Sequence, residues 1–412
     1  MHSVSDRRAW AQEIIWQRGQ DEAARRLKQF CHMLMETERD AFLGCRHHER
    51  SRGRRGYRNG YHKRFLGTLF GVLALRVPRV RGADRPLRTL LFDLYARRTR
   101  DVETAVEAWV AAGCSTRAVV DVMTETFSHA VSPATISRII AKIDVELALW
   151  RTRPLERSYR VLWLDAKHGK VRKPPPKGRR GRKRRRRGRK QKGVLLVAWG
   201  LTHDGREELV DLEACSGEER YEVWEPFLTR LWERGLRPWN RWDERLEVIV
   251  TDGHGGLEAA VQTVYPTVPK QRCLFHKMQN LTQHLADRRN RKALLASAAR
   301  IWRDVQTAAE AQARLAAWTQ WWRPEEPEAV ATLVEGFEQT LTYLTLPPAL
   351  RQRVRTNNPI ERFMGEIEKA TDHVPLWEDP ASWNRHVWIL WKRLKHRSYR
   401  PTRPQPEFTQ TS

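Results

Sequence analysis

The sequence has few cysteines, no long apolar run and none of the common nucleotide-binding motifs. Its 412 residues include five cysteines, too few and too scattered for a disulfide framework, which suits a reducing cytoplasm. The longest apolar run, at residues 193–201, is far shorter than the roughly 20 residues that cross a bilayer. Residues 1–20 lack the apolar segment of a signal peptide. With no P-loop and no dinucleotide-binding glycine motif, ATP and NAD chemistry have no support. These absences predict a cytoplasmic protein without a membrane partner.

Acidic residues are scarce beside basic ones, since 49 Asp or Glu against 76 Lys or Arg give a formal net charge of +27. Residues 46–100 hold 16 Lys or Arg and 3 Asp or Glu, and residues 172–192 hold 14 Lys or Arg and no acid. Such concentrated charge releases counterions from a polyphosphate and predicts a nucleic-acid partner. An anionic membrane surface is the alternative, but neither block forms an amphipathic basic helix with an aromatic face.

The N-terminal part begins with a predicted helix. Residues 7–45 carry apolar side chains at three- and four-residue spacing, with no Gly or Pro between residues 20 and 43. The next segment, residues 52–61, is rich in Arg, Gly and Tyr, and a strand is predicted at residues 72–77. Two interpretations of 52–61 remain open: Arg58 and Tyr61 contact nucleic acid, with the tyrosines stacking on bases or sugars, or the segment is a solvated turn.

Residues 104–147 are predicted to form a small helical unit. One amphipathic helix follows Ser115, and a second begins at Ser132, a favourable N-cap, with Pro133 as its first helical residue. This arrangement resembles a helix-turn-helix whose second helix enters the major groove, which makes Ser132, Thr135 and Arg138 candidate DNA contacts. An ordinary helical hairpin is the alternative.

The pattern after residue 159 predicts an α/β sheet. Strands are expected at 160–164, 193–201, 208–214, 246–251 and 270–274, with helices at 219–234 and 256–264. Three strands followed by helix, strand, helix and strand are the element order of the ribonuclease H type. Residues 277–350, rich in Ala, Leu and Trp, are predicted to form an all-α insertion in this core.

The predicted domain organisation follows from these segments. It comprises an N-terminal helical and basic DNA-binding region (1–100), a helix-turn-helix-like domain (101–150), the first part of the core (151–276) with a basic insertion (172–192), the helical insertion (277–350), the last part of the core (351–398) and a tail (399–412). In the basic insertion the candidate phosphate contacts are Arg182, Arg184, Arg185 and Arg186.

Three carboxylates are candidates for chemistry. Asp165 shares a face with Trp163 near the end of a predicted central strand, where a carboxylate is costly unless it binds a cation or accepts hydrogen bonds. Asp252 directly follows the predicted strand at 246–251, and functional groups gather at such strand ends. Glu361 lies at the edge of the buried stripe of a predicted helix. The structural alternatives are a satisfied strand-end Asp, a helix N-cap, and a capping-box Glu whose cap is Asn358.

Cys273 and His276 form a Cys-x2-His pair. No second Cys or His pair follows at a usable spacing, so a structural zinc site is not predicted. Packing or hydrogen bonding is the expected role of these two side chains.

Four ordered blocks resemble the signature blocks of Mutator-like insertion-sequence transposases. They are Asp165-Ala166-x-x-x-Lys170-Val171-Arg172, Thr251-Asp252-Gly253-His254-x-Gly256-Leu257, Gln271-Arg272-Cys273-x-x-His276-Lys277 and Arg355-Thr356-Asn357-Asn358-x-x-Glu361. The resemblance implies a ribonuclease H-like core with a helical insertion before the glutamate, and a catalytic Asp-Asp-Glu triad of Asp165, Asp252 and Glu361. It also implies divalent-metal-dependent cleavage and joining of DNA in a bacterial cytoplasm, at the nucleoid.

The residue types suit that chemistry. Phosphodiester cleavage by two Mg²⁺ or Mn²⁺ ions needs several hard oxygen ligands from separate elements, which the three carboxylates would supply. His254, Cys273 and His276 are candidates to support these ligands. The expected partners are double-stranded DNA, as terminal inverted repeats and target, and further copies of the chain in a homodimer or larger homo-oligomer. The alternatives are a sequence-specific DNA-binding protein with an inactive core and a ribonuclease H-like nuclease without strand transfer.

Overall fold

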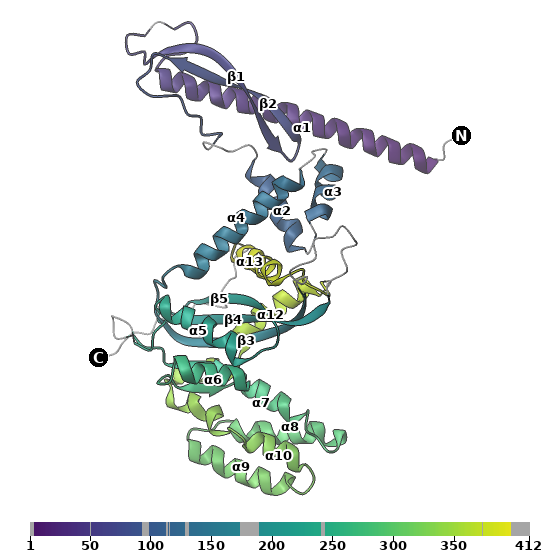
Figure 1. The fold of residues 1–412 in the computed structure, drawn as a ribbon, viewed down its shortest axis with the longest axis vertical. Coiled ribbons are helices and arrows are strands. Elements are labelled where there is room, and N and C mark those ends of the chain that lie inside the picture. The colour runs from purple at the N-terminus through teal and green to yellow at the C-terminus, as the bar shows by residue number, and fades with distance from the viewer. Residues whose placement is uncertain are drawn as a thin grey trace, which may run out of the picture. The chain divides into compact units, whose positions relative to one another are not determined.

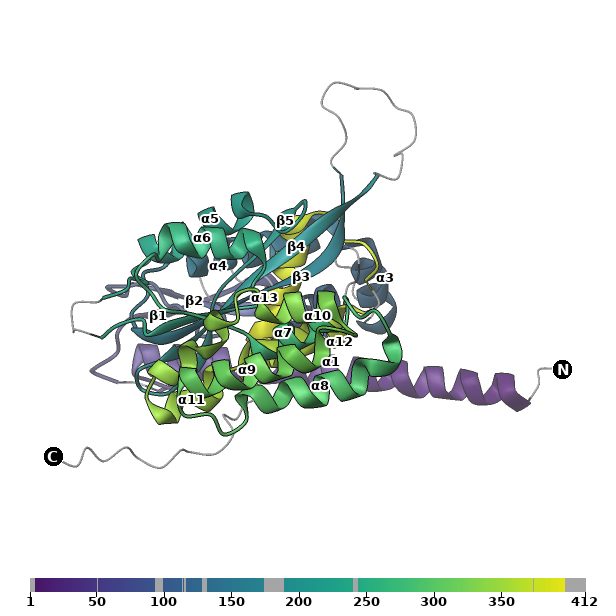
Figure 2. The same ribbon diagram turned by 90° about the horizontal axis from the view of Figure 1, so that it is seen from below.

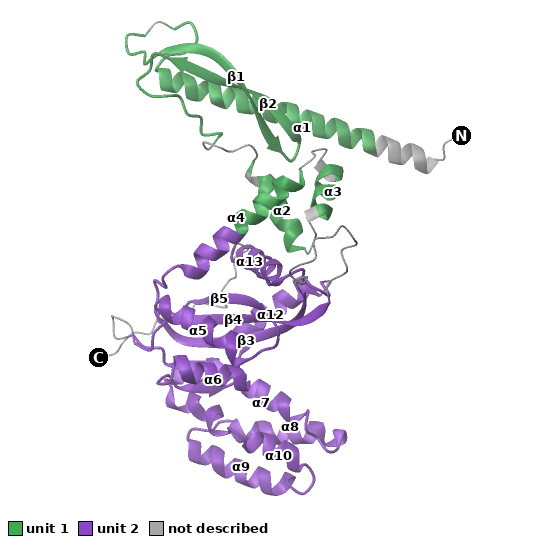
Figure 3. Cartoon of the chain, in the orientation of Figure 1, with its two compact units in different colours: residues 1–143 green, residues 144–412 purple. Residues whose placement is uncertain are grey.

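The computed structural model describes residues 4–49, 51–92, 99–112, 114, 116–127, 132–173, 189–239, 244–372 and 374–396. The chain divides into two compact units, residues 1–143 and residues 144–412 (Figure 3). The division falls inside one long helix, α4 (Pro133–Thr152), whereas the boundary predicted from the sequence follows residue 150.

Unit 1 begins with helix α1 (Val4–Leu43) and an antiparallel hairpin of β1 (Tyr57–Thr68) and β2 (Gly71–Arg81). Cys31 and Met35 of α1 pack with Leu66 and Leu75 of the hairpin in one buried cluster. The helix and the strand at 72–77 were predicted, but β1 was not. Because most side chains of β1 are exposed or half-buried, its sequence lacks the apolar character by which strands are recognised.

A second cluster in unit 1 joins three helices, α2 (Arg100–Ala111), α3 (Thr116–Phe127) and the start of α4. Val106, Val119, Met123 and Ile136 are fully buried in this cluster. Ser132 caps α4 as predicted, because its Oγ accepts a hydrogen bond from the Thr135 N–H at 3.2 Å. The two predicted helices therefore exist, and α2 packs against them.

Unit 2 is built on a five-stranded sheet in the order β5-β4-β3-β6-β7. The strands are β3 (Tyr159–Arg172), β4 (Lys190–Thr202), β5 (Glu207–Ser216), β6 (Val248–Thr251) and β7 (Lys270–Arg272). The first three pair antiparallel, and β6 and β7 join them in parallel. The expected α/β class is confirmed, but the expected end of the first strand at residue 164 is wrong. β3 continues to Arg172 because β4 pairs with its polar second half.

Helices cover both faces of this sheet (Figures 1 and 2). Helices α5 (Tyr221–Glu233) and α6 (Gly255–Val264) share a buried cluster with Leu162, Leu164 and Leu196 of the sheet. On the other face lie α12 (Asn358–Thr371) and α13 (Pro380–His396), where the ring of Trp199 is 5.4 Å from that of Phe363 and 5.5 Å from that of Trp391. Asp165 lies between these two layers, in the strand nearest the middle of the sheet.

Between β7 and α12 the chain forms helices. The α-helices are α7 (Leu274–Leu281), α8 (Arg291–Ala299), α9 (Ala308–Trp322), α10 (Pro327–Val334) and α11 (Pro348–Val354), and the short 3₁₀ helices are η1 (Arg288–Asn290), η2 (Arg300–Trp302) and η3 (Glu338–Thr345). Across the described parts of the chain, no helix has both the length and the apolar character needed to cross a membrane.

Candidate active site

Asp165 and Asp252 occupy matching positions on neighbouring strands. Residues 161–163 of β3 pair in parallel with residues 248–250 of β6, so each aspartate lies two residues beyond the last pair. Asp165 lies within β3 rather than near its end as expected from the sequence, and the parallel register brings it to the point where β6 ends, next to Asp252. In β3, period-two alternation places Asp165 on the same face as Trp163, whose indole reaches the segment before α12. The two aspartates are therefore brought together as predicted.

The environment of Asp165 disfavours its ionised form. The side chain is 9% exposed, and burial together with the negative charge of Asp252 raises its pKa to about 7. The charge of Glu361 acts in the same direction, while a hydrogen bond from the backbone of Ala166 opposes it. Asp252 and Glu361 thus both lie within electrostatic range of Asp165.

Asp252 lies in the turn between β6 and α6. The N-cap of α6 is His254, and its N–H donates to Asp252 Oδ1 at 2.8 Å. The alternative that Asp252 itself caps the helix is therefore wrong. Gly253 between them has φ +89°, and a Cβ there would lie 2.2 Å from Nε of Arg272, so this turn requires glycine.

Glu361 is in the first turn of α12. The segment before this helix is fixed by three hydrogen bonds: Trp163 Nε1 donates to the carbonyl of Thr356 (3.2 Å), the Leu274 N–H donates to the carbonyl of Arg355 (2.9 Å), and the Asn357 N–H donates to Cys273 Sγ (3.3 Å). The first of these contacts comes from the strand that carries Asp165. Packing between distant parts of the chain thus sets the position of Glu361.

Glu361 is not a capping-box residue. The N-cap of α12 is Asn357 rather than Asn358, and its side chain makes no capping hydrogen bond within the described structure. Oε1 of Glu361 is buried without a hydrogen-bond partner among the described residues. Burial raises the pKa of this carboxyl, and the charge of His276 opposes the shift.

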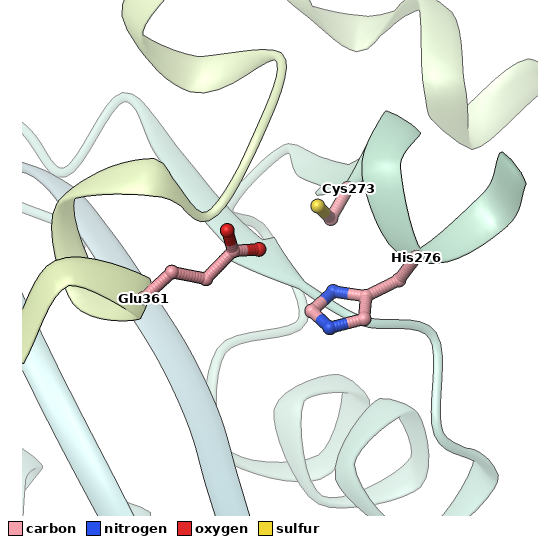
Figure 4. Close-up of side chains that lie close together, drawn as sticks. All are labelled: Cys273, His276 and Glu361. Atoms are coloured by element: carbon pink, nitrogen blue, oxygen red, sulfur yellow. The ribbon is translucent and has the colours of Figure 1, made fainter. Parts of the chain in front are cut away.

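A second group of side chains shares Glu361. One ligand atom each of Cys273, His276 and Glu361 lies within 4.8 Å of the others (Figure 4). Among the described residues, this is the one trio of His, Cys, Asp or Glu with such convergent ligand atoms, and the two aspartates are not part of it. Cys273 and His276 were predicted to support the candidate carboxylates. The structure gives both of them Glu361 as a direct neighbour.

Sequence reasoning missed Glu219 and His168. Glu219 is 5% exposed and lies next to both His168 Nε2, at 3.3 Å, and His254 Nδ1, at 3.6 Å. Burial acts to raise the pKa of Glu219, but the hydrogen bonds from His168 and Trp224 outweigh it and keep the pKa below its ordinary value. The sequence carried no clear signal for these two residues, because the burial of Glu219 results from tertiary packing. His254, a predicted supporting residue, joins this group.

Four of the predicted DNA contacts in unit 1 take part in hydrogen bonds within the protein. Arg58 donates to Asp40 Oδ1 at 2.8 Å and to the carbonyl of Cys45, and the Tyr61 hydroxyl donates to Glu36 at 2.9 Å. The Ser132 hydroxyl donates to Thr135 Oγ1 at 3.1 Å.

Arg138 is exposed on α4 and makes no ion pair with a described residue of the chain. The four arginines of the basic insertion, Arg182, Arg184, Arg185 and Arg186, lie outside the described residues. Of residues 52–61, only 52–56 agree with the turn interpretation, because β1 begins at Tyr57.

This combination of a mixed sheet, helices on both faces and acids clustered where β6 ends beside β3 defines an α/β protein with a candidate metal-dependent site. The chain belongs to the Mutator family of transposases, whose family model matches residues 2–399. The resemblance inferred from the four sequence blocks is confirmed.

Named relatives agree with this family. The chain is 33% identical to the transposase for insertion sequence element ISRM5 of Rhizobium meliloti (strain 1021), over 87% of this chain and 83% of that protein. It is 32% identical to the transposase for insertion sequence element IS406 of Burkholderia multivorans, over 93% of both chains. Among solved structures, the Drosophila P element transposase strand transfer complex aligns with 72% of this chain and 80% of that chain, at 12% identity and a TM-score of 0.30.

Proposed function

We propose that this protein is a transposase that binds the terminal inverted repeats of its own insertion sequence, cleaves the DNA at the element ends and joins the freed 3′-hydroxyl groups to target DNA. The observation that carries the proposal is the acidic cluster of Asp165, Asp252 and Glu361. None of these carboxyls forms an ion pair with a Lys, Arg or His among the described residues, and Asp165 experiences the negative charges of both Asp252 and Glu361. Clustered charge without a counterion is costly and is characteristic of a cation-binding site.

The topology supports a ribonuclease H-like core. Three antiparallel strands followed by two parallel ones, with helices on both faces, agree with the element order expected from the sequence. Asp165 lies on the central strand β3, and Asp252 follows its parallel neighbour β6. Glu361 is on α12, the helix that packs on the sheet face to which Trp199 contributes. Three ligands on separate elements can hold a geometry that a single loop could not.

The donor set fits Mg²⁺ or Mn²⁺. Asp165, Asp252 and Glu361 offer hard carboxylate oxygens, and together they would hold two such ions. When bound, the ions supply activation of a water or 3′-hydroxyl and stabilisation of the leaving oxygen. The protein's own contribution is orientation: the β3–β6 register sets the two aspartates, and the hydrogen bonds around residues 355–357 set the glutamate.

DNA recognition is assigned to the basic regions. The exposed Arg138, on the helix capped by Ser132, is proposed to read bases in the major groove, with Thr135 on the same face. The arginines of residues 172–192 are proposed to contact phosphates. Joining two element ends at one target requires at least two active sites, so the working form is proposed to be a homodimer or a larger homo-oligomer.

The decisive experiment incubates the full chain with DNA that carries the gene's own flanking sequences, in Mg²⁺ or Mn²⁺ and in EDTA. Metal-dependent cleavage at the element ends and joined products are expected for the wild type. Asp165→Ala, Asp252→Ala and Glu361→Ala should lose both reactions and keep repeat binding. Glu366→Ala is the matched control, because this acid of α12 pairs with Lys369 on the surface.

Three results would contradict the proposal in different ways. Cleavage without joined products would indicate a nuclease without strand transfer. Repeat binding without any metal-dependent cleavage would indicate a DNA-binding protein with an inactive core. Full activity in the three alanine variants would remove the acidic cluster from the chemistry.

A further inference from the structure

Cys273, His276 and Glu361 form a compact group of unlike ligands. Cys273 is the residue before α7, His276 is in the first turn of that helix, and Glu361 is in the first turn of α12. One ligand atom of each lies within 4.8 Å of the other two, and Figure 4 shows the three side chains pointing toward a common point. The sequence pair Cys-x2-His thus acquires a third ligand from a distant part of the chain.

Two atoms of this group lack hydrogen-bond partners. Oε1 of Glu361 and Nδ1 of His276 are both buried, and neither has a partner among the described residues. Buried polar atoms are almost always paired, and an unpaired one points to a water or an ion. Two such atoms on neighbouring side chains, beside a thiol, indicate that this space receives a ligand.

Backbone N–H groups partly offset the cost of a buried thiolate at Cys273. The side chain is fully buried, and burial raises its pKa to about 11. The backbone N–H groups of His276 and Asn357 act in the opposite direction, and the Asn357 N–H donates to Sγ at 3.3 Å. N–H donors and a helix N-terminus stabilise negative charge on sulfur. A thiophilic cation at this point would supply the remaining compensation for the thiolate charge.

We propose that Cys273, His276 and Glu361 bind one Zn²⁺ ion. Sulfur, imidazole nitrogen and carboxylate oxygen together are ligands typical of zinc, and three protein ligands leave one position for water. Mg²⁺ avoids thiolate, so this site and the acidic cluster select different ions. The binding claim does not depend on the proposed function.

The shared glutamate gives the site a regulatory effect, and this part rests on the proposed function. A Zn²⁺ ion on Glu361 neutralises the charge that the acidic cluster needs to hold Mg²⁺. Zinc is therefore expected to inhibit Mg²⁺-dependent DNA cleavage by competing for one side chain.

The binding test uses the full chain and Co²⁺ as a spectroscopic substitute for zinc, in a buffer with Mg²⁺. The wild type should show a thiolate-to-cobalt charge-transfer band that Zn²⁺ abolishes. Cys273→Ser should lose the band and weaken Co²⁺ binding at least about tenfold. Cys215→Ser is the matched control, because this half-buried cysteine of β5 lies in the same unit and should leave both unchanged.

His276→Gln is the second variant, for the case in which Cys273→Ser does not fold, and it should also weaken binding at least about tenfold. A wild type without the band, or a band that persists in both folded variants, overturns the site. Binding without thiolate absorption would mean that the buried atoms hold water and the cobalt lies elsewhere.

The activity test measures cleavage at fixed Mg²⁺ and rising Zn²⁺, with each protein normalised to its own zinc-free rate. Cys273→Ser should require at least about tenfold more Zn²⁺ for half-inhibition than Cys215→Ser. Equal sensitivity of the two variants would overturn the regulatory claim. If the wild type fails to cleave even without zinc, the proposed function fails, and the cobalt titration still decides the metal site.

Discussion

Two buried aspartates of the same sheet have opposite electrostatic surroundings. Asp211 on β5 is fully buried and pairs with Arg230 at 2.9 Å, Arg234 at 3.0 Å and Arg151 at 3.4 Å. Asp165 on β3 is almost as buried, but it forms no ion pair among the described residues, and burial together with the charges of Asp252, Glu361 and Glu219 raises its pKa. The charge of Asp211 is thus neutralised by arginines of the protein, whereas Asp165 has no ion-pair partner among the described residues.

The difference separates a structural acid from a functional one. A buried charge is tolerated when partners surround it, and removal of one partner leaves the others uncompensated. A buried charge without partners is destabilising and persists where a ligand completes it. Substitution of the two kinds of acid should therefore have different consequences for activity and for stability.

Glu361→Gln should reduce DNA cleavage on the order of a thousandfold or more, because the amide keeps the size of the side chain and loses the charge that holds metal. Single-turnover cleavage of repeat DNA in Mg²⁺ measures the effect. Glu366→Gln on the same helix is the control. Near-normal cleavage by Glu361→Gln would place this residue outside the metal site.

Asp211→Asn should lower the free energy of unfolding by about 3 to 5 kcal/mol, because it leaves buried arginines without their counterion. Urea unfolding followed by circular dichroism measures it. Asp204→Asn, in the exposed turn between β4 and β5, should change stability by less than about 1 kcal/mol. If the two variants unfold alike, the network around Asp211 is not structural.

Asp165→Asn should have the opposite effect on stability to Asp211→Asn. It should raise the free energy of unfolding of the metal-free protein at pH 8 by about 1 to 4 kcal/mol. The folded state raises the pKa of Asp165 from 3.8 to about 7, so ionisation opposes folding above pH 7. As pH falls from 7 toward 4, the folded state takes up the proton first and the wild type regains this stability. The difference in unfolding free energy between Asp165→Asn and the wild type, measured in EDTA, should therefore be smaller at pH 5 than at pH 8. A variant less stable than the wild type at pH 8 would refute the electrostatic argument.

The same distinction applies to arginines in unit 1. Arg138→Ala should reduce discrimination between the cognate repeat and random duplex by about 1 to 3 kcal/mol, because an exposed Arg can read guanine with two hydrogen bonds. Arg58→Ala should affect stability instead, since Arg58 is paired with Asp40. Binding to both DNAs at one fixed salt concentration measures the effect. Equal losses on the two DNAs would make Arg138 a phosphate contact.

The smallest effect is expected from replacing residues 174–188 with a short Gly/Ser link, which removes nine Lys or Arg and spares β3 and β4. For every phosphate that these side chains neutralise, the replacement should reduce the log–log salt slope of duplex binding by about 0.9, with little change in sequence discrimination. Titrations over a range of salt concentrations provide the slope. An unchanged slope would show that these residues do not bind DNA.

Local patterns predicted much of unit 2. Short apolar or alternating segments located its five strands, and the order of strands and helices indicated the class of sheet. Hydropathy patterns failed where most side chains of a strand are exposed or half-buried, and where pairing with a partner strand imposes the extended conformation. The hairpin strand β1 and the second half of β3 are polar, so their pairing could not be read from hydropathy.

The sequence by itself determined the family, through four ordered blocks, and placed Asp165 and Asp252 at strand positions where parallel pairing brings them together. Only the tertiary structure decided what surrounds each charge. It joined Glu361 to Cys273 and His276, put Glu219 beside two histidines, and paired Asp211 with arginines. Periodicity and turn chemistry are local properties of a chain, whereas burial and the presence of a counterion depend on contacts between residues far apart in sequence.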